Sequence, residues 1–177
     1  VLDGSGDYVN LDAHIPTFSG FTEGTIAAWV KLTDSGEGTI FGVSDKDEAT
    51  ELIKFGIEGG QLKWLNINDS GGYVIGYSDE LLNDDTWHHV AVTVGADGNR
   101  LYIDGKAASV SYVGGSATDS GFFSEITDPD AIDIGRSVRG GLSEAEYLGQ
   151  LDDVRLYSRA LSTADIAALA PLAPVAL

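Results

Sequence analysis

The run Trp87-His88-His89 contains the residues whose types most readily suggest chemistry. Histidine can act as a general base or bind a metal, but each role needs a nucleophile, a carboxylate or further ligands arranged beside it. No serine or carboxylate motif accompanies the pair, and His14 stands alone in a predicted loop. We therefore expect both adjacent histidines to be structural, and no catalytic residue is predicted here.

The composition is acidic and lacks cysteine and methionine. The net charge is −18 and the sequence pI is about 4.1, which argues against nucleic acid or anionic membranes as partners. Without cysteine there are no disulfides or thiolate ligands, so any bound ion must have oxygen ligands. These features favour an extracellular or cell-surface protein, with bacteria as the expected source.

No segment has the pattern of a membrane span or a signal peptide. An uninterrupted apolar run of about 18 residues is absent from the sequence, so we expect no direct membrane insertion. The first residues, Val1-Leu2-Asp3-Gly4, have neither a basic nor a long apolar region. A mature secreted domain would begin in the same way, so this does not favour the cytoplasm.

Period-two alternation dominates the chain and predicts β-strands. From Trp87 onward, Val90, Val92 and Val94 alternate with His89, Ala91 and Thr93, and a turn at 95–99 leads to a second strand of a central hairpin. The predicted strands are 7–11, 25–32, 39–43, 51–57, 61–67, 73–77, 87–94, 100–106, 107–113, 131–135 and 147–157. The segments 114–130 and 136–146 are predicted to be loops, and the length of the first suggests a functional surface.

The predicted helix lies near the end of the chain. Ser162 is a suitable N-cap, Asp165 completes a capping box, and Leu161 can pack on Ile166 as a hydrophobic staple. The helix should end before Pro171. The pattern predicts an all-β, two-sheet antiparallel sandwich with one short C-terminal helix, a domain over 1–170 and a linker or tail over 171–177.

Three segments resemble the motifs of a known family. They are Leu2-Asp3-Gly4-Ser5-Gly6-Asp7-Tyr8-Val9 at the start, Trp87-His88-His89-Val90-Ala91 with Leu101-Tyr102-Ile103-Asp104-Gly105 in the middle, and 149–162 at the end. Their order and sequence are similar to those of the laminin G-like, concanavalin A-like lectin/glucanase family. The resemblance implies a jelly-roll sandwich, a fold that hosts lectins, carbohydrate-binding modules, adhesion domains and glycosidases.

A glycosidase with this fold would need a pair of carboxylates about 5 Å apart for retaining chemistry. The resemblance implies that, in related enzymes, such a pair occupies alternate positions of one strand. Glu144 and Glu146 fall in a predicted loop, and Asp128 and Asp130 are separated by a proline. We therefore predict that the domain is not an enzyme.

The two ends of the chain supply a candidate metal site. Asp152 shares the parity of Val154 and Leu156, which should face the core, and a carboxylate near the interior must be paired or bound to a metal. The family resemblance implies a structural Ca²⁺ where the two termini meet, and oxygen ligands suit that ion. The candidate ligands are Asp3, Asp7, Asp152 and Asp153. The alternative is an ion pair from Asp152 or Asp153 to Arg155, Arg159 or Lys31.

Two further acidic groups are weaker candidates. Asp45, Asp47 and Glu48 form one, and Asp128, Asp130 and Asp133 form the other. Neither matches the twelve-residue calcium loop with its fixed glycine and terminal glutamate. We expect both to be solvated charged loops.

Ligand binding requires an aromatic surface with hydrogen-bonding groups beside it. Our first candidate is Trp64 on a predicted strand, followed by Asn66, Asn68 and Asp69, with Tyr73 and Tyr77 across the next turn. The alternative is that these aromatic residues fill the core. Two groups compete with this site. One is Arg136 with Arg139, and the other is Tyr112, Phe122 and Phe123 beside Asp119, in which Phe122-Phe123 could form an exposed apolar patch.

These observations predict a non-catalytic carbohydrate-binding, lectin-like module of a secreted or cell-surface protein, stabilised by structural calcium. Its expected partners are a polysaccharide or glycan and neighbouring domains of a larger chain. The alternative is a protein-binding or spacer domain of a large surface adhesin without a sugar site.

Overall fold

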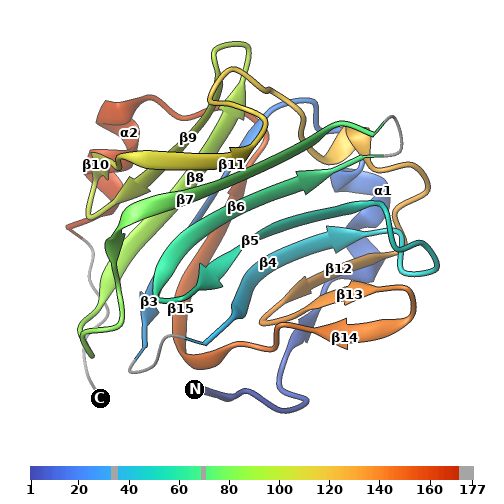
Figure 1. Ribbon diagram of the computed structural model, residues 1–177, viewed down its shortest axis with the longest axis horizontal. Helices are drawn as coiled ribbons and strands as arrows, with labels where there is room; N and C mark the ends of the chain where they lie inside the picture. The colour runs from blue at the N-terminus through green and yellow to red at the C-terminus, as the bar shows by residue number, and fades with distance from the viewer. Residues whose placement is uncertain (33–35, 69–70, 172–177) are drawn as a thin grey trace.

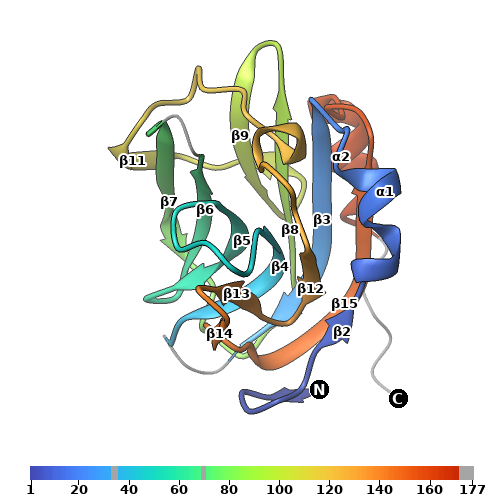
Figure 2. The same ribbon diagram turned by 90° about the vertical axis from the view of Figure 1, so that its right-hand side faces the viewer.

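The computed structural model describes residues 1–32, 36–68 and 71–171 and shows two antiparallel sheets packed face to face (Figures 1 and 2). The six-stranded sheet has the order β1 (Leu2–Asp3), β15 (Leu148–Tyr157), β3 (Gly24–Lys31), β8 (His88–Gly95), β9 (Gly98–Ile103) and β10 (Lys106–Ala107). The seven-stranded sheet has the order β11 (Val110–Gly114), β7 (Tyr73–Leu81), β6 (Gln61–Ile67), β5 (Leu52–Glu58), β4 (Gly38–Ser44), β12 (Ala131–Ile134) and β2 (Val9–Asn10). The predicted sandwich is confirmed.

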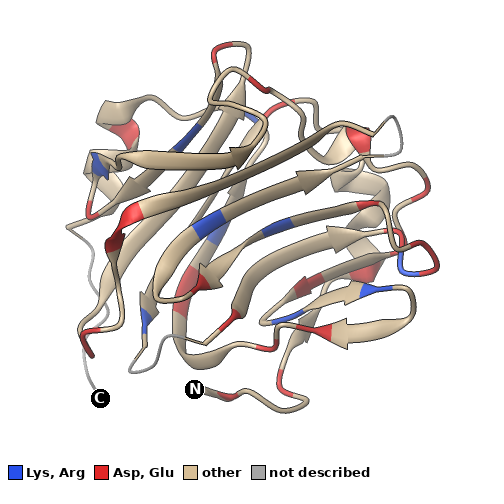
Figure 3. Cartoon of the chain, in the orientation of Figure 1, with Lys and Arg blue, Asp and Glu red and all other residues tan. Residues whose placement is uncertain are grey.

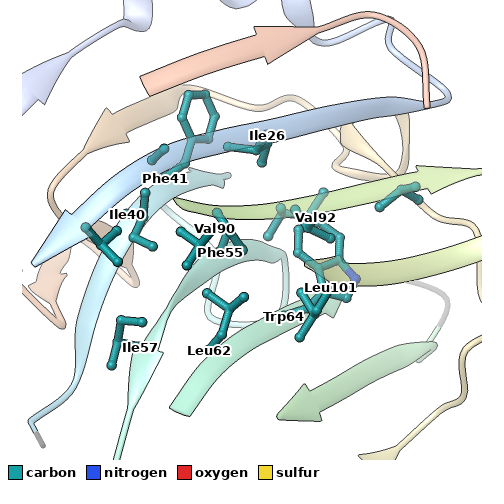
Figure 4. Packing of buried hydrophobic residues seen from close by; sticks show 14 of the residues in the cluster. Ile26, Ile40, Phe41, Phe55, Ile57, Leu62, Trp64, Val90, Val92 and Leu101 are labelled. Carbon is teal, nitrogen blue, oxygen red and sulfur yellow. The ribbon is translucent and has the colours of Figure 1, made fainter. Parts of the chain in front are cut away.

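The core lies between the sheets and is filled by alternate residues of each strand (Figure 4). From the six-stranded sheet, Ile26 and Val90 point inward, and from the other sheet Phe55 and Trp64 meet them. Each of these side chains is at most 1% exposed, so it gains the free energy of apolar burial, typically about 1.5–3 kcal/mol for a large side chain. The predicted central hairpin is β8–β9, where Val90 pairs with Ile103.

The C-terminal helix has the predicted start. Helix α2 (Thr163–Leu169) begins after Ser162, whose side chain accepts a hydrogen bond from the Asp165 backbone N–H while the Asp165 side chain accepts from the Ser162 N–H. Leu161 and Ile166 are both buried against the outer face of the six-stranded sheet. In the described part of the chain, no helix has the length and apolar character to cross a membrane.

Some local predictions were wrong. The chain also forms the 3₁₀ turn η1 (Asp12–His14) and the one-turn helix α1 (Ile15–Phe18), in which Pro16 occupies a helix-compatible first-turn position. Only β2 forms within the strand predicted over 7–11. The strand predicted over 107–113 is divided into β10 and β11.

The two predicted loops differ from expectation. Residues 136–146 contain a hairpin of β13 (Ser137–Arg139) and β14 (Leu142–Glu144), because Gly140 and Gly141 both adopt the positive φ that a tight turn requires. The segment 114–130 contains the 3₁₀ turn η2 (Phe123–Glu125). Phe122 and Phe123 are fully buried and stack at 4.1 Å between ring centroids, so they do not form the predicted exposed patch.

Candidate ligand site

Strand register separates the predicted ligand residues onto opposite faces of the seven-stranded sheet. Trp64 lies opposite Gly76, whereas Tyr77 lies opposite Lys63. Trp64 therefore points into the core, where it is 1% exposed and its ring centroid lies 6.4 Å from that of Phe122. The prediction that Trp64 is a ligand platform is wrong, because a ring enclosed by the core has no face for a sugar.

A pocket forms where the end of β6 and the start of β7 meet η2 and the loop before it. Asn66 and Tyr73 both line it, and Asp69, a predicted ligand residue between them, lies outside the described residues. The pocket has a volume of about 240 Å³, below the roughly 300–1,000 Å³ of sites for drug-sized ligands. The residues that line it include Asn66, Asn68, Tyr73, Asp119, Gly121 and Glu125.

Hydrogen bonds from two amides hold the carboxylate of Glu125 in the pocket. Its Oε2 accepts from Asn68 Nδ2 at 2.9 Å and from Asn66 Nδ2 at 3.4 Å. Asn66 is 3% exposed, and its Oδ1 is buried without a hydrogen-bond partner among the described residues. A buried acceptor of this kind costs about 1–3 kcal/mol unless it is satisfied, so Asn66 is suited to receive a donor from a ligand or water.

The opposite wall is formed by the loop that carries Asp119. Asp119 Oδ2 accepts from the Ser116 N–H at 2.6 Å and from Ser116 Oγ at 3.0 Å. Gly121 lies beside the Glu125 carboxylate, and a Cβ at this position would be 1.9 Å from Glu125 Oε2. A glycine is therefore needed for the carboxylate to reach the two amides.

Tyr73 lines the pocket edge, but its side chain lies on the outer face of the sheet, as that of Tyr77 does. Asn66 lies on the other face, because Asn66 pairs with Val74 whereas Tyr73 pairs with Ile67. Tyr73 is 53% exposed, although its ring lies over the backbone of Gly114, where a Cβ would be 1.9 Å from Tyr73 Cε2. Packing on one side limits the rotation of the ring, while the exposed area lies on the outer side of the sheet. Glycine at position 114 is thus required for this placement.

The sequence prediction included Asn66, Asn68 and Tyr73 but assigned no role to Glu125 or Gly121. The signal was the length of the 114–130 loop, which indicated a functional surface without identifying its residues. Asp119 was considered only beside aromatic residues, and the burial of Phe122 and Phe123 places the polar residues of this loop, rather than the apolar ones, at the surface.

A second polar group covers the outer face of β5–β7. Lys54 pairs with Glu37, Lys63 pairs with Glu58, and Tyr77 Oη donates to Glu58 Oε2 at 3.0 Å. Burial lowers the pKa of Lys54, and the bond to Glu37 offsets only part of that effect. Burial and then the bond to Glu58 raise the pKa of Tyr77, so this hydroxyl remains a neutral donor. Tyr77 thus belongs to this group rather than to the pocket.

Arg136 is engaged elsewhere. Its Nε donates to Asp133 Oδ2 at 2.8 Å, and its guanidinium carbon lies 3.3 Å from the ring centroid of Tyr8. It does not line the pocket of Asn66 and Tyr73. The structure therefore brings together three of the predicted ligand residues and places Trp64, Tyr77 and Arg136 in other environments.

The predicted terminal metal ligands are not gathered into one site. Strand β1 pairs with Leu148 and Gly149, whereas Asp152 pairs with Trp29 further along β15. Asp152 is exposed because the register shifts between Asp152 and Arg155, with Asp153 in the left-handed region at a φ of 49°. Asp153 instead forms the alternative ion pair with Arg155, at 2.6 Å. Asp3 and Asp7 stay together, since the Asp3 N–H donates to Asp7 Oδ2 at 3.2 Å. These four residues do not fit a common calcium ion.

Within the described ranges, the carboxylates that do come together are Asp45, Asp47 and Asp130, whose ligating atoms lie within 4.8 Å of one another. Antiparallel pairing of β4 with β12 brings the two acidic loops together. Lys46 Nζ already lies 3.0 Å from Asp130 Oδ2, and the Asp47 N–H donates to Asp45 Oδ1 at 2.9 Å. The chemistry of the donor set suits calcium, although the lysine provides part of the required positive charge.

The fold and motifs define the class of protein. A family model described as the concanavalin A-like lectin/glucanases superfamily matches residues 3–167. The chain belongs to this family, so the predicted family is confirmed.

Solved structures with the same fold extend over almost the whole chain. The CBM40 carbohydrate-binding module of Ruminococcus gnavus IT-sialidase is 17% identical, covers 96% of this chain and 95% of its own, and has a TM-score of 0.82. The same module bound to α2,3-sialyllactose has a TM-score of 0.80. A leech intramolecular trans-sialidase is 20% identical with a TM-score of 0.77, over 99% of this chain but 27% of the enzyme.

One relative by sequence is a much longer protein. The sushi, von Willebrand factor type A, EGF and pentraxin domain-containing protein 1 of Rattus norvegicus is 26% identical over 187 aligned residues. The match covers 98% of this chain and 5% of the rat protein. The chain therefore spans a small part of this relative's length.

Proposed function

We propose that this domain is a non-catalytic carbohydrate-binding module of a secreted or cell-surface protein, and that the pocket of Asn66, Tyr73 and Glu125 is its sugar site. The observation that carries the proposal is the meeting, in one pocket, of a pre-oriented carboxylate and a buried amide oxygen that has no hydrogen-bond partner among the described residues. Support also comes from the similar fold of a CBM40 module solved with sialyllactose.

The chemistry of the pocket suits a sugar ring. Hydroxyl groups would donate to Asn66 Oδ1 and to the Glu125 carboxylate. The carboxylates of Glu125 and Asp119 both accept hydrogen bonds from protein donors, which favours the binding of sugar hydroxyls over proton transfer. The volume of about 240 Å³ matches a single ring or chain end better than a long segment of polysaccharide.

A glycan array followed by calorimetry tests this proposal. Glu125 is exposed, and Glu125→Ala should weaken binding of any array ligand at least tenfold, because the carboxylate that accepts from the sugar hydroxyls is lost. Leu81→Ala, an exposed apolar truncation at the end of β7 away from the pocket, should leave the affinity unchanged. Absence of binding to all glycans at millimolar concentrations would contradict the proposal and favour a protein-binding or spacer domain.

The proposed setting is a larger extracellular chain. The rat relative is a multi-domain protein of which this domain matches a small part, and the acidic, cysteine-free composition fits a saline or calcium-rich exterior. Neighbouring domains are accordingly the second class of proposed partner.

A further inference from the structure

The described lining of the pocket carries negative charge without a compensating cation. Asp119 and Glu125 both line it, and no lysine or arginine does so among the described residues. Their partners are neutral amides, a hydroxyl and a backbone N–H, and neither carboxylate forms an ion pair with a described residue. The whole chain adds to this field, with 28 acidic residues against 10 lysines and arginines.

The lysines on the described strands of this sheet, and Arg136 beside it, already have acidic partners. Lys54 and Lys63 are the lysines of the described strands of this sheet, and each is paired with a glutamate. The Lys54 side chain is 4% exposed, so little of it can reach a ligand. Arg136, which follows β12, bonds to Asp133 and stacks on Tyr8. In Figure 3 the blue positions of β5 and β6 lie amid acidic ones.

An acidic sugar entering this pocket would place its carboxylate or sulfate beside two like charges. In a partly desolvated site, such repulsion at a few ångströms is large enough to determine which ligand binds. A sugar hydroxyl has the opposite preference, because it donates to Asp119, Glu125 and Asn66 Oδ1. The sialyllactose seen in the CBM40 structure carries the negative charge that this pocket disfavours.

We infer that the domain selects glycans without acidic groups, and that Asp119 and Glu125 are its specificity-determining residues. This inference rests on the proposed carbohydrate-binding function. It assigns the ligand class from the charges of this chain, and it differs from the ligand of the structurally similar CBM40 module.

Matched pairs of glycans test the inference. Each pair has the same neutral core with and without a terminal sialic acid or sulfate, and binding is measured at 50 mM NaCl with EDTA present. We expect the neutral member to bind at least tenfold more tightly. Raising NaCl to 500 mM should narrow this ratio, because salt screens the repulsion of the acidic member and has little effect on the neutral one.

Two variants connect the preference to the named residues. Glu125→Gln and Asp119→Asn keep side-chain size while removing charge, and each should narrow the ratio of neutral to acidic binding severalfold at low salt. Asp97→Asn, an exposed carboxylate in the β8–β9 turn, is the matched control and should leave the ratio unchanged. The salt series on the unmodified protein tests the inference even if a variant does not fold.

The outcomes separate the inference from the proposed function. Equal or tighter binding of the acidic member would overturn the inference and leave carbohydrate binding intact. A ratio that salt and both variants leave unchanged would overturn the assignment to Asp119 and Glu125. Failure of every glycan to bind would overturn the proposed function and the inference with it.

Discussion

Trp64 and Tyr73 lie on neighbouring strands but on opposite faces of one sheet. Trp64 is enclosed by the core beside Phe122, while Tyr73 is half exposed over Gly114. A residue's parity on its own strand does not decide which face is buried, because both faces of β6 carry apolar residues: Leu62 and Trp64 on one, Leu65 on the other. The cross-strand register decides it.

Trp64→Ala should destabilise the fold strongly. Removing a buried aromatic side chain costs about 3–5 kcal/mol, since the surrounding residues fill the cavity only in part. Urea or guanidinium unfolding followed by fluorescence and circular dichroism measures the loss. Tyr73→Ala is the comparison and should cost under about 1 kcal/mol, as expected at the surface. A Trp64→Ala protein as stable as the parent would contradict the burial described here.

At the scale of elements, His88 connects two turns of the six-stranded sheet. Its Nδ1 lies 2.9 Å from Asp104 Oδ2 in the turn after β9, and its Nε2 lies 3.1 Å from Asp84 Oδ1 in the turn before β8. Burial by itself lowers the pKa of His88, but the bonds to Asp104 and Asp84 outweigh it and the pKa is raised. Bonds from Thr86 and then His88 lower the pKa of Asp84 to about 2. His88 therefore has a structural role, because it connects the two turns through Asp104 and Asp84.

The raised pKa of His88 predicts a pH-dependent stability. Because the pKa of His88 is higher in the folded protein, its protonated form stabilises the fold. This contribution is fully present below the unfolded-state pKa of about 6.5 and is lost as the pH rises through the pKa in the folded state. His88→Gln should remove this component, measured as the midpoint of thermal unfolding between pH 5.5 and 9. Burial lowers the pKa of His89, which acts in the opposite direction but is common to both proteins and cancels in their difference. Identical pH profiles for parent and variant would refute the role of His88.

At the scale of the whole molecule, the net charge of −18 predicts that bound cations stabilise the folded state. Self-repulsion of this magnitude disfavours the compact state, and the cluster of Asp45, Asp47 and Asp130 concentrates three carboxylates between β4 and β12. The sequence predicted a structural calcium at the chain termini. The geometry makes this cluster the better candidate for the same ion.

Calcium should raise the unfolding temperature of the EDTA-treated protein, since an ion that binds only the folded state stabilises it, by about 2.7 kcal/mol at a hundredfold excess over its Kd. Asp47→Asn should abolish this shift, and Asp152→Asn should retain it. Asp47 is exposed, so its replacement tests the ion without disturbing the core. Magnesium and NaCl at matched ionic strength control for general screening. No shift with calcium would remove the calcium prediction, and loss of the shift in Asp152→Asn alone would restore the terminal site.

The sequence determined the class of fold because its signals are local. Alternation, glycine turns and the capping box of Ser162 and Asp165 act over a few residues, and they predicted the principal strands and the C-terminal helix. The family motifs added the order of the strands. The short α1 and the β13–β14 hairpin were missed, because a single turn or a three-residue strand contains too few residues to show periodicity.

The tertiary structure decided the site. Asn66 and Glu125 are 59 positions apart and meet only because β6 and η2 lie at the same end of the sandwich. The shift of register in β15 turned Asp152 outward, and the pairing of β4 with β12 joined two acidic loops that are unremarkable separately. Which distant side chains share a pocket depends on strand register and loop closure, and those follow from contacts across the whole domain.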